Sequence, residues 1–166
     1  FHFFFGFYSV YQRTICRKGN LFLTFAHNIN DKLTMEQLLH YVWKHKIFPL
    51  MPLQTTSGQP VEVIDAGLPN TDAGPDFFNA KLKINGTLWV GNVELHTQAS
   101  DWFRHGHNRD TVYDNVILHV VGESDCEVYY ANGGIVPQLL LHCPDNVRRR
   151  YDELRQTEIY PPCYSI

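Results

Sequence analysis

The dipeptide Asn85-Gly86 lies between two runs of strand-forming residues and constrains the fold more than any other feature of the chain. Asn-Gly is a strong signal for a two-residue β-hairpin, because both positions of a type I′ turn need a positive φ. The sequence therefore predicts antiparallel strands over Phe77–Ile84 and Thr87–His96. Side chains two apart on a strand share a face, so Glu94 and His96 are expected to point the same way.

Other segments extend this hairpin into a larger sheet. Further strands are predicted over Val61–Asp65, Val116–Val121, Glu127–Tyr130 and Val136–Leu141, and helices over Met35–Lys46 and Asp145–Gln156. Residues 101–114 are polar and aromatic and predict a helix or a long connection. Val116–Val121 is almost continuously apolar, as a strand buried on both faces would be. We therefore expect an α/β (α+β) fold with a mixed central sheet flanked by helices.

The strand Thr87–His96 changes character along its length. The face that ends at Leu95 is apolar throughout. The opposite face starts with Leu88 and Val90 and becomes polar from Asn92 onward. This pattern predicts a strand that is buried on both faces at its start and borders a cleft at its end.

Composition and charge narrow the class of protein. The chain has 166 residues, of which 44% are hydrophobic, enough for one domain with a sizeable core. No segment is long and apolar enough to span a membrane. The four cysteines show no CxxC spacing, which favours neither a zinc knuckle nor a disulfide framework and predicts a reducing, cytoplasmic setting.

The first 34 residues differ from the rest of the chain. They lack periodicity, whereas Met35 opens an amphipathic helix, so we expect residues 1–34 to be a non-native or irregular extension of a domain over 35–166. The tail Tyr160–Ile166 has no terminating element, as in a truncated chain. Residues 35–166 hold 10 of the 14 basic and 16 of the 17 acidic side chains, a net charge of −6. This balance disfavours binding to a nucleic acid backbone without a metal.

Two carboxylates stand out against the predicted strands. Gly74-Pro75 predicts a tight turn that leaves Asp76 at the start of one strand, and Glu94 lies near the end of the next. Carboxylates that meet at strand ends can hold a divalent ion over a substrate. Taken singly, each residue is more commonly structural, since Gly-Pro-Asp is ordinary turn chemistry and outward-facing Glu or His is usually solvated.

Longer stretches of the chain resemble an uncharacterised bacterial family, domain of unknown function 2851. The matching stretches are Pro60–Asp65, Asn70–Ala80, Gly86–His96, Asp101-Trp102, His105–His107 and Tyr113–Val121. They cover most of the chain after Met35, and members of the family are longer than this chain. The family implies no activity.

A second resemblance does imply one. A helix, three strands, a helix and a strand, with Pro75-Asp76 before one strand and Glu94-Leu95-His96 in the next, is similar to the PD-(D/E)xK nucleases. The resemblance implies a restriction-endonuclease-like core and a metal-dependent phosphodiesterase acting on DNA or RNA. Its Mg²⁺ or Mn²⁺ would be held by Asp76, Glu94 and the carbonyl of Leu95. His96 replaces the usual lysine and would position or deprotonate the attacking water.

The same resemblance gives Glu36 a role as an outer carboxylate from the first helix. A solvated residue in a helix's first turn, favoured by the helix dipole, is the simpler expectation for Glu36. Likewise, Arg148–Arg150 offers charge for phosphate, although such a run is more often a solvated helix face.

Two alternatives remain open from sequence. One is a histidine-rich Zn²⁺ or Fe²⁺ enzyme, with ligands drawn from His96, His105, His107 and His119 together with Asp101 and Asp110. Histidines in a polar loop are more often solvated, and a histidine in an apolar run is more often a satisfied core residue. The other is a non-catalytic scaffold that binds partners through aromatic side chains at Trp102-Phe103 and Tyr129-Tyr130.

Overall fold

The computed structural model describes residues 35–151, which fall within one of the two units of the chain, Met35–Ile166. The elements in chain order are a helix over residues 35–44, β1 (Leu53–Gln54), β2 (Pro60–Asp65), β3 (Leu68–Pro69), β4 (Phe77–Ile84), β5 (Thr87–Gln98), α3 (Asp101–Arg104), the 3₁₀ helices η1 (His107–Arg109) and η2 (Thr111–Tyr113), β6 (Val116–Glu123), β7 (Gln138–Leu140) and a helix over residues 145–151. The expectations for residues 1–34 and for the end of the last helix lie outside the described residues.

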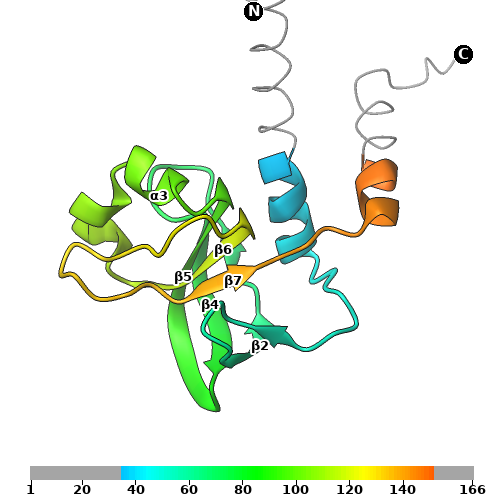
Figure 1. Ribbon diagram of the computed structural model, residues 1–166, viewed down its shortest axis with the longest axis horizontal. Coiled ribbons are helices and arrows are strands. Elements are labelled where there is room, and N and C mark those ends of the chain that lie inside the picture. The colour runs from blue at the N-terminus through cyan, green and yellow to red at the C-terminus, as the bar shows by residue number, and fades with distance from the viewer. Residues whose placement is uncertain (1–34, 152–166) are drawn as a thin grey trace, which may run out of the picture. The chain divides into compact units, whose positions relative to one another are not determined.

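The strands form one mixed sheet in the order β1-β2-β4-β5-β6-β7, with β3 beside β4. Neighbours from β1 to β5 are antiparallel, whereas β5, β6 and β7 are parallel. The predicted mixed sheet flanked by helices is confirmed (Figure 1). A bridge between Thr55 and Leu139 also joins the two outer strands, so the sheet curls until its first and last strands meet.

The Asn85-Gly86 turn joins β4 to β5 as predicted. Both residues have positive φ, 49° and 80°, and Ile84 pairs with Thr87 across the turn. These are the dihedral signs of a type I′ turn, whose twist matches that of the flanking strands. The hairpin sets the register as far as the Ala80–Gly91 pair, and a bulge then shifts it so that Phe77 at the start of β4 pairs with Val93.

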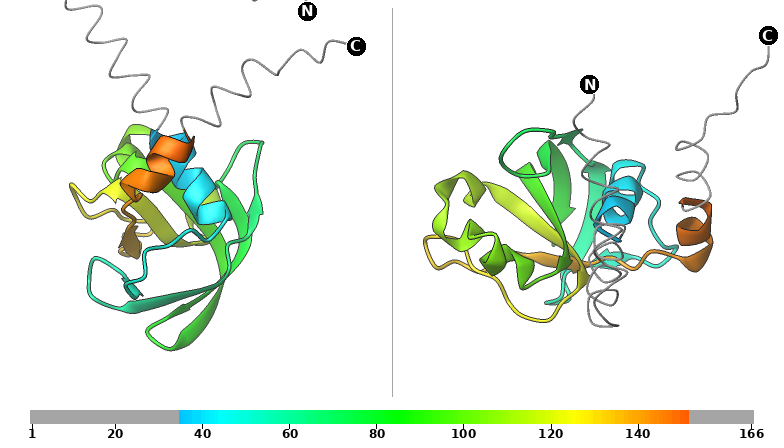
Figure 2. Two further views of the ribbon diagram at one scale, coloured as in Figure 1. Left: turned by 90° about the vertical axis from the view of Figure 1, so that its right-hand side faces the viewer. Right: turned by 90° about the horizontal axis from the view of Figure 1, so that it is seen from above.

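The burial of β5 is the reverse of what its sequence predicted. Leu88, Trp89 and Val90 are 61%, 49% and 58% exposed, whereas every residue from Asn92 to His96 is buried. The cause is the sheet topology, because β6 pairs with β5 only from Asn92 onward. The first residues of β5 therefore extend past that neighbour (Figure 2), and the polar end of the strand lies inside the protein.

The helix over residues 35–44 covers one face of the sheet and α3 lies on the other side (Figure 1). Leu38, Leu39, Val42 and Trp43 of the helix are at most 1% exposed and pack with the apolar side chains of β4, β5 and β6. Trp43 Nε1 also donates a hydrogen bond to the Ala66 carbonyl over 3.0 Å. The other face has its own core around Trp102, Val116 and Val121.

The segments that follow β5 and β6 can be compared with the sequence prediction. Residues 101–114, predicted as a helix or a long connection, form one turn of helix and two 3₁₀ helices. The predicted strand Glu127–Tyr130 is wrong, since this segment makes only a bridge between Tyr129 and Ile135, and the predicted strand Val136–Leu141 shortens to β7. The segment keeps two backbone hydrogen bonds, Val136 to the Val128 carbonyl and Tyr130 to the Gly134 carbonyl, and is also held by Trp102 Nε1, which donates to the Tyr129 carbonyl.

Candidate functional site

Asp76 and Glu94 are held together by reciprocal hydrogen bonds. The Asp76 amide donates to Glu94 Oε2 over 3.1 Å, and the amide of Leu95 donates to Asp76 Oδ2 over 2.8 Å. The turn before β4 supports this arrangement, since Asn70 Nδ2 donates to the Pro75 carbonyl. Each carboxylate is thus fixed by a backbone amide of the other's strand, which restrains both side chains.

Burial of this pair changes the proton affinity of both groups. Burial raises the pKa of Asp76, an effect opposed by nearby His40 and by the Leu95 hydrogen bond. Burial, and then the charge of Asp76, raises the pKa of Glu94 to about 9. Two carboxylates that disfavour each other's charge in a buried site create a demand for a proton or a cation.

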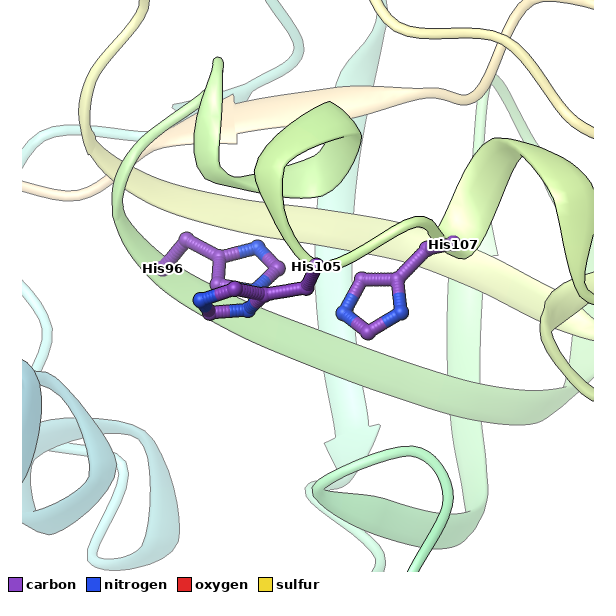
Figure 3. Close-up of side chains that lie close together, drawn as sticks. All are labelled: His96, His105 and His107. Carbon is purple, nitrogen blue, oxygen red and sulfur yellow. The ribbon is translucent and has the colours of Figure 1, made fainter.

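Three histidines gather beside Glu94. Its Oε1 lies 3.1 Å from His107 Nε2 and 3.5 Å from His96 Nε2. His96 Nε2 also lies 3.0 Å from His105 Nδ1, and one ring nitrogen from each of the three histidines lies within 4.8 Å of the others. Figure 3 shows the three rings along β5, with His105 and His107 coming from the connection to β6. This set of nitrogen and oxygen atoms can hold a metal ion.

His119 lies beneath this group on β6, in register with Glu94. It is fully buried, and its Nε2 is 2.8 Å from His96 Nδ1, whereas its own Nδ1 has no hydrogen-bond partner among the described residues. Burial lowers the pKa of His119 to about 3, so the ring is neutral at ordinary pH. His119 contacts His96 from the core and is not part of the three-histidine group.

Aromatic rings hold His107 in place. It stacks on Tyr113 with ring centroids 3.7 Å apart and meets Trp102 edge-on at 5.3 Å. Burial lowers the pKa of His107 and raises that of Tyr113 to about 12, the latter with a further contribution from Glu94. Both groups are therefore neutral near pH 7, and a neutral imidazole offers a lone pair.

The first helix contributes two further residues. His40 Nε2 lies 3.5 Å from Asp76 Oδ2. Glu36, one turn earlier on the same helix face, is half-buried, and burial raises its pKa while His40 lowers it and Asp76 raises it. Neither the solvated role nor the outer-carboxylate role of Glu36 is tested by its position at the edge of this group. His40 was missed from sequence, although its spacing of four from Glu36 was a usable signal.

Besides His119, the two predicted aspartate ligands of the histidine site lie outside the cluster. Asp101 is buried and pairs with Arg104, and it also accepts a hydrogen bond from the amide of Gln98. Asp110 is exposed and caps η2 by accepting from the Val112 amide. The expectation that both loop histidines are solvated holds for His105, which is exposed, but not for His107, which is buried.

The aromatic surface expected for a partner-binding scaffold is only partly present. Trp102 is fully buried, and Tyr130 is half-buried and bonded to the backbone, which leaves Phe103 and Tyr129 at 39% and 38% exposed. Two partly exposed rings do not form the large apolar patch that marks an interface.

Comparison with protein families matches residues 36–166 to the family described as "Protein of unknown function (DUF2851)". The chain belongs to this family. No curated protein and no solved structure matches the chain. Among the described residues, the DUF2851 chain has no helix with the length and apolar character needed to cross a bilayer.

Proposed function

We propose that this DUF2851 chain is a metal-dependent phosphodiesterase of the PD-(D/E)xK type that cleaves DNA or RNA, with Asp76, Glu94 and His96 as its central residues. The observation that carries the proposal is the reciprocal pairing of the Asp76 carboxylate with the β5 backbone and of Glu94 with the Asp76 amide, just before β4. A buried and a partly buried carboxylate fixed side by side in this way cost stability unless a cation compensates them.

The order of the strands supports the proposal by analogy. β2, β4 and β5 form an antiparallel meander, and a helical connection then leads to the parallel strand β6. Asp76 precedes β4 and Glu94 lies in β5, where the acids of the nuclease pattern would fall. The analogy concerns arrangement only, so the chemistry must rest on the residues themselves.

A divalent ion would activate a water and neutralise charge on a phosphodiester. Asp76 and Glu94 would hold the ion, and His96, whose Nε2 is 3.5 Å from Glu94 Oε1, would orient or accept a proton from the attacking water. Tyr113 remains a neutral phenol at the same site and can donate a hydrogen bond to a phosphate oxygen.

The charge of the chain agrees with a metal-dependent approach to phosphate. With a net −6 over residues 35–166, nucleic acid gains little from the protein's own field. Arg148, Arg149 and Arg150 are exposed on the helix over residues 145–151 and would contribute at most a local attraction.

The proposal is tested by replacing each carboxylate with its amide. Asp76→Asn and Glu94→Gln should abolish Mn²⁺-dependent cleavage of labelled DNA and RNA, because each removes a negative ligand. Glu62→Gln is the matched control, since Glu62 is exposed on β2. Wild-type rates in both site variants would rule out this function.

A further inference from the structure

We propose that His96, His105, His107 and Glu94 form one preorganised site for a transition-metal ion of the Zn²⁺ class, with His119 as a positioning residue. This inference rests on the proposed function for the ion's role in hydrolysis and revises it at two residues: His96 becomes a ligand instead of the residue that orients the water, and Asp76 is not among the four donors. Ion binding itself is tested without substrate.

The spacing of the donor atoms is that of neighbouring ligands on one ion. Ligands ~2.1 Å from a metal lie ~3.0 Å apart in octahedral and ~3.4 Å apart in tetrahedral geometry. Three donor contacts here measure 3.0, 3.1 and 3.5 Å, and they run from His105 through His96 and Glu94 to His107. The three histidine nitrogens also lie within 4.8 Å of one another, so side-chain rotations toward a shared ion would bring the four donors to ligand spacing.

Hydrogen bonding accounts for the contacts of His96 with His105 and His119 but not for the position of His107. His107 is 7% exposed, yet its Nε2 has no hydrogen-bond partner among the described residues, because its 3.1 Å contact with Glu94 Oε1 lacks hydrogen-bond geometry. A buried ring nitrogen that lies close to a carboxylate without a hydrogen bond to it is destabilising. An ion between the two atoms would satisfy both.

The donor set selects the class of metal. Three imidazole nitrogens and one carboxylate oxygen suit Zn²⁺, Fe²⁺, Co²⁺ or Mn²⁺, whereas Mg²⁺ prefers an all-oxygen shell. The histidine-rich site predicted from sequence also included His119, Asp101 and Asp110. The proposed site lacks these three residues and contains Glu94, which that prediction did not include.

His119 is suited to orienting His96. A ring nitrogen binds a metal through its lone pair, so His96 carries its proton on Nδ1 when Nε2 is a ligand. That proton points at His119 Nε2, 2.8 Å away in the core. Ligating histidines commonly donate their second nitrogen to a partner of this kind.

The test uses the full chain, stripped with a chelator and reloaded with Zn²⁺ or Co²⁺. We expect one tightly held ion per chain by elemental analysis, and a visible Co²⁺ spectrum of nitrogen ligation. His105→Ala and His107→Ala should each lose the spectrum, whereas the exposed His45→Ala should not. Binding of no ion by the folded wild-type chain, or unchanged spectra in both site variants, would overturn the proposal.

His119 is tested by two further variants. His119→Gln keeps an acceptor for His96 Nδ1 and should bind Co²⁺ nearly as the wild type does, whereas His119→Leu should bind ~10–100-fold more weakly with a shifted spectrum. Equal affinity and spectra in both would overturn the positioning role. A loaded chain that cleaves no phosphodiester would support the site and overturn the proposed function.

Discussion

Asp76 and Glu94 are joined through their strands, because the Asp76 amide donates to Glu94 Oε2 and the amide next to Glu94 donates to Asp76 Oδ2. The arrangement restrains two carboxylates whose charges repel, and burial makes the repulsion stronger. In the metal-free chain this pair therefore opposes folding.

Removing the charge of Asp76 should relieve this repulsion. Asparagine keeps an oxygen that can accept from the Leu95 amide and removes the charge that disfavours ionised Glu94. The metal-free Asp76→Asn variant should therefore unfold at the same or a higher temperature than the wild type, while losing activity. Thermal unfolding in chelator measures this, with the exposed Asp72→Asn as control. Marked destabilisation of Asp76→Asn alone would contradict the electrostatic account.

The stability of the metal-free chain should depend on pH through Glu94. Its pKa is about 9 in the folded chain against an ordinary pKa of 4.5, so the folded state holds a proton that the unfolded state releases between these values. The stabilisation is complete below pH 4.5 and is lost as pH rises toward 9. The slope for one group is at most ~1.4 kcal/mol per pH unit. Glu94→Gln should flatten this alkaline limb in denaturant titrations, and Glu62→Gln should not.

His119 should make the free energy of unfolding depend on pH in the opposite direction, on the acid side. Its pKa falls from 6.5 to about 3 on folding, so the unfolded state binds a proton that the folded state does not. Its contribution is complete above pH 6.5 and is lost as pH falls toward 3. Unfolding free energies of His119→Leu should therefore fall less steeply in acid than those of the wild type. An identical acid limb would contradict the assignment of a neutral, buried ring.

Truncating a buried side chain of the first helix should destabilise the fold strongly. Leu39 is 0% exposed against the sheet, so Leu39→Ala should lower the free energy of unfolding by ~2–5 kcal/mol through lost burial and a residual cavity. Leu50 is fully exposed, and Leu50→Ala should change it by less than ~0.5 kcal/mol. Chemical denaturation of the two variants makes the comparison, and equal effects would contradict the docking of this helix.

His96 can be tested as a stand-in for lysine. If the imidazole only orients water or supplies positive charge, His96→Lys should retain or raise the rate with Mg²⁺, whereas His96→Ala should lower it. The lysine variant should at the same time lose the Co²⁺ spectrum, because an ammonium group offers no lone pair. Retention of that spectrum in His96→Lys would contradict the assignment of His96 as a ligand.

Local signals predicted much of this fold. Asn85-Gly86 specifies its turn through backbone dihedrals, and the apolar stripe of Leu38, Leu39, Val42 and Trp43 specifies its helix, so both appear where expected. The burial of β5 depends instead on where β6 begins to pair with it, a long-range fact that the alternation of Thr87–His96 does not contain.

In the site, too, some contacts follow from local sequence and others depend on long-range packing. Glu94 and His96 share a face because strand geometry requires it, and their contact was predictable. The approach of His105 and His107 depends on how residues 99–115 fold between β5 and β6, and the approach of His40 depends on helix docking. Spacing along the chain does not encode these contacts, so the exclusion of Asp101 and Asp110 could not be foreseen.

The most direct test of the central claim is cleavage of labelled single-stranded and duplex DNA and RNA by the full chain with Mn²⁺, Mg²⁺ or Zn²⁺. The account predicts hydrolysis that appears with an added ion, disappears with chelator and is absent in Asp76→Asn. A folded, metal-loaded wild-type chain that leaves every substrate intact, or cleavage that survives in Asp76→Asn, would contradict it.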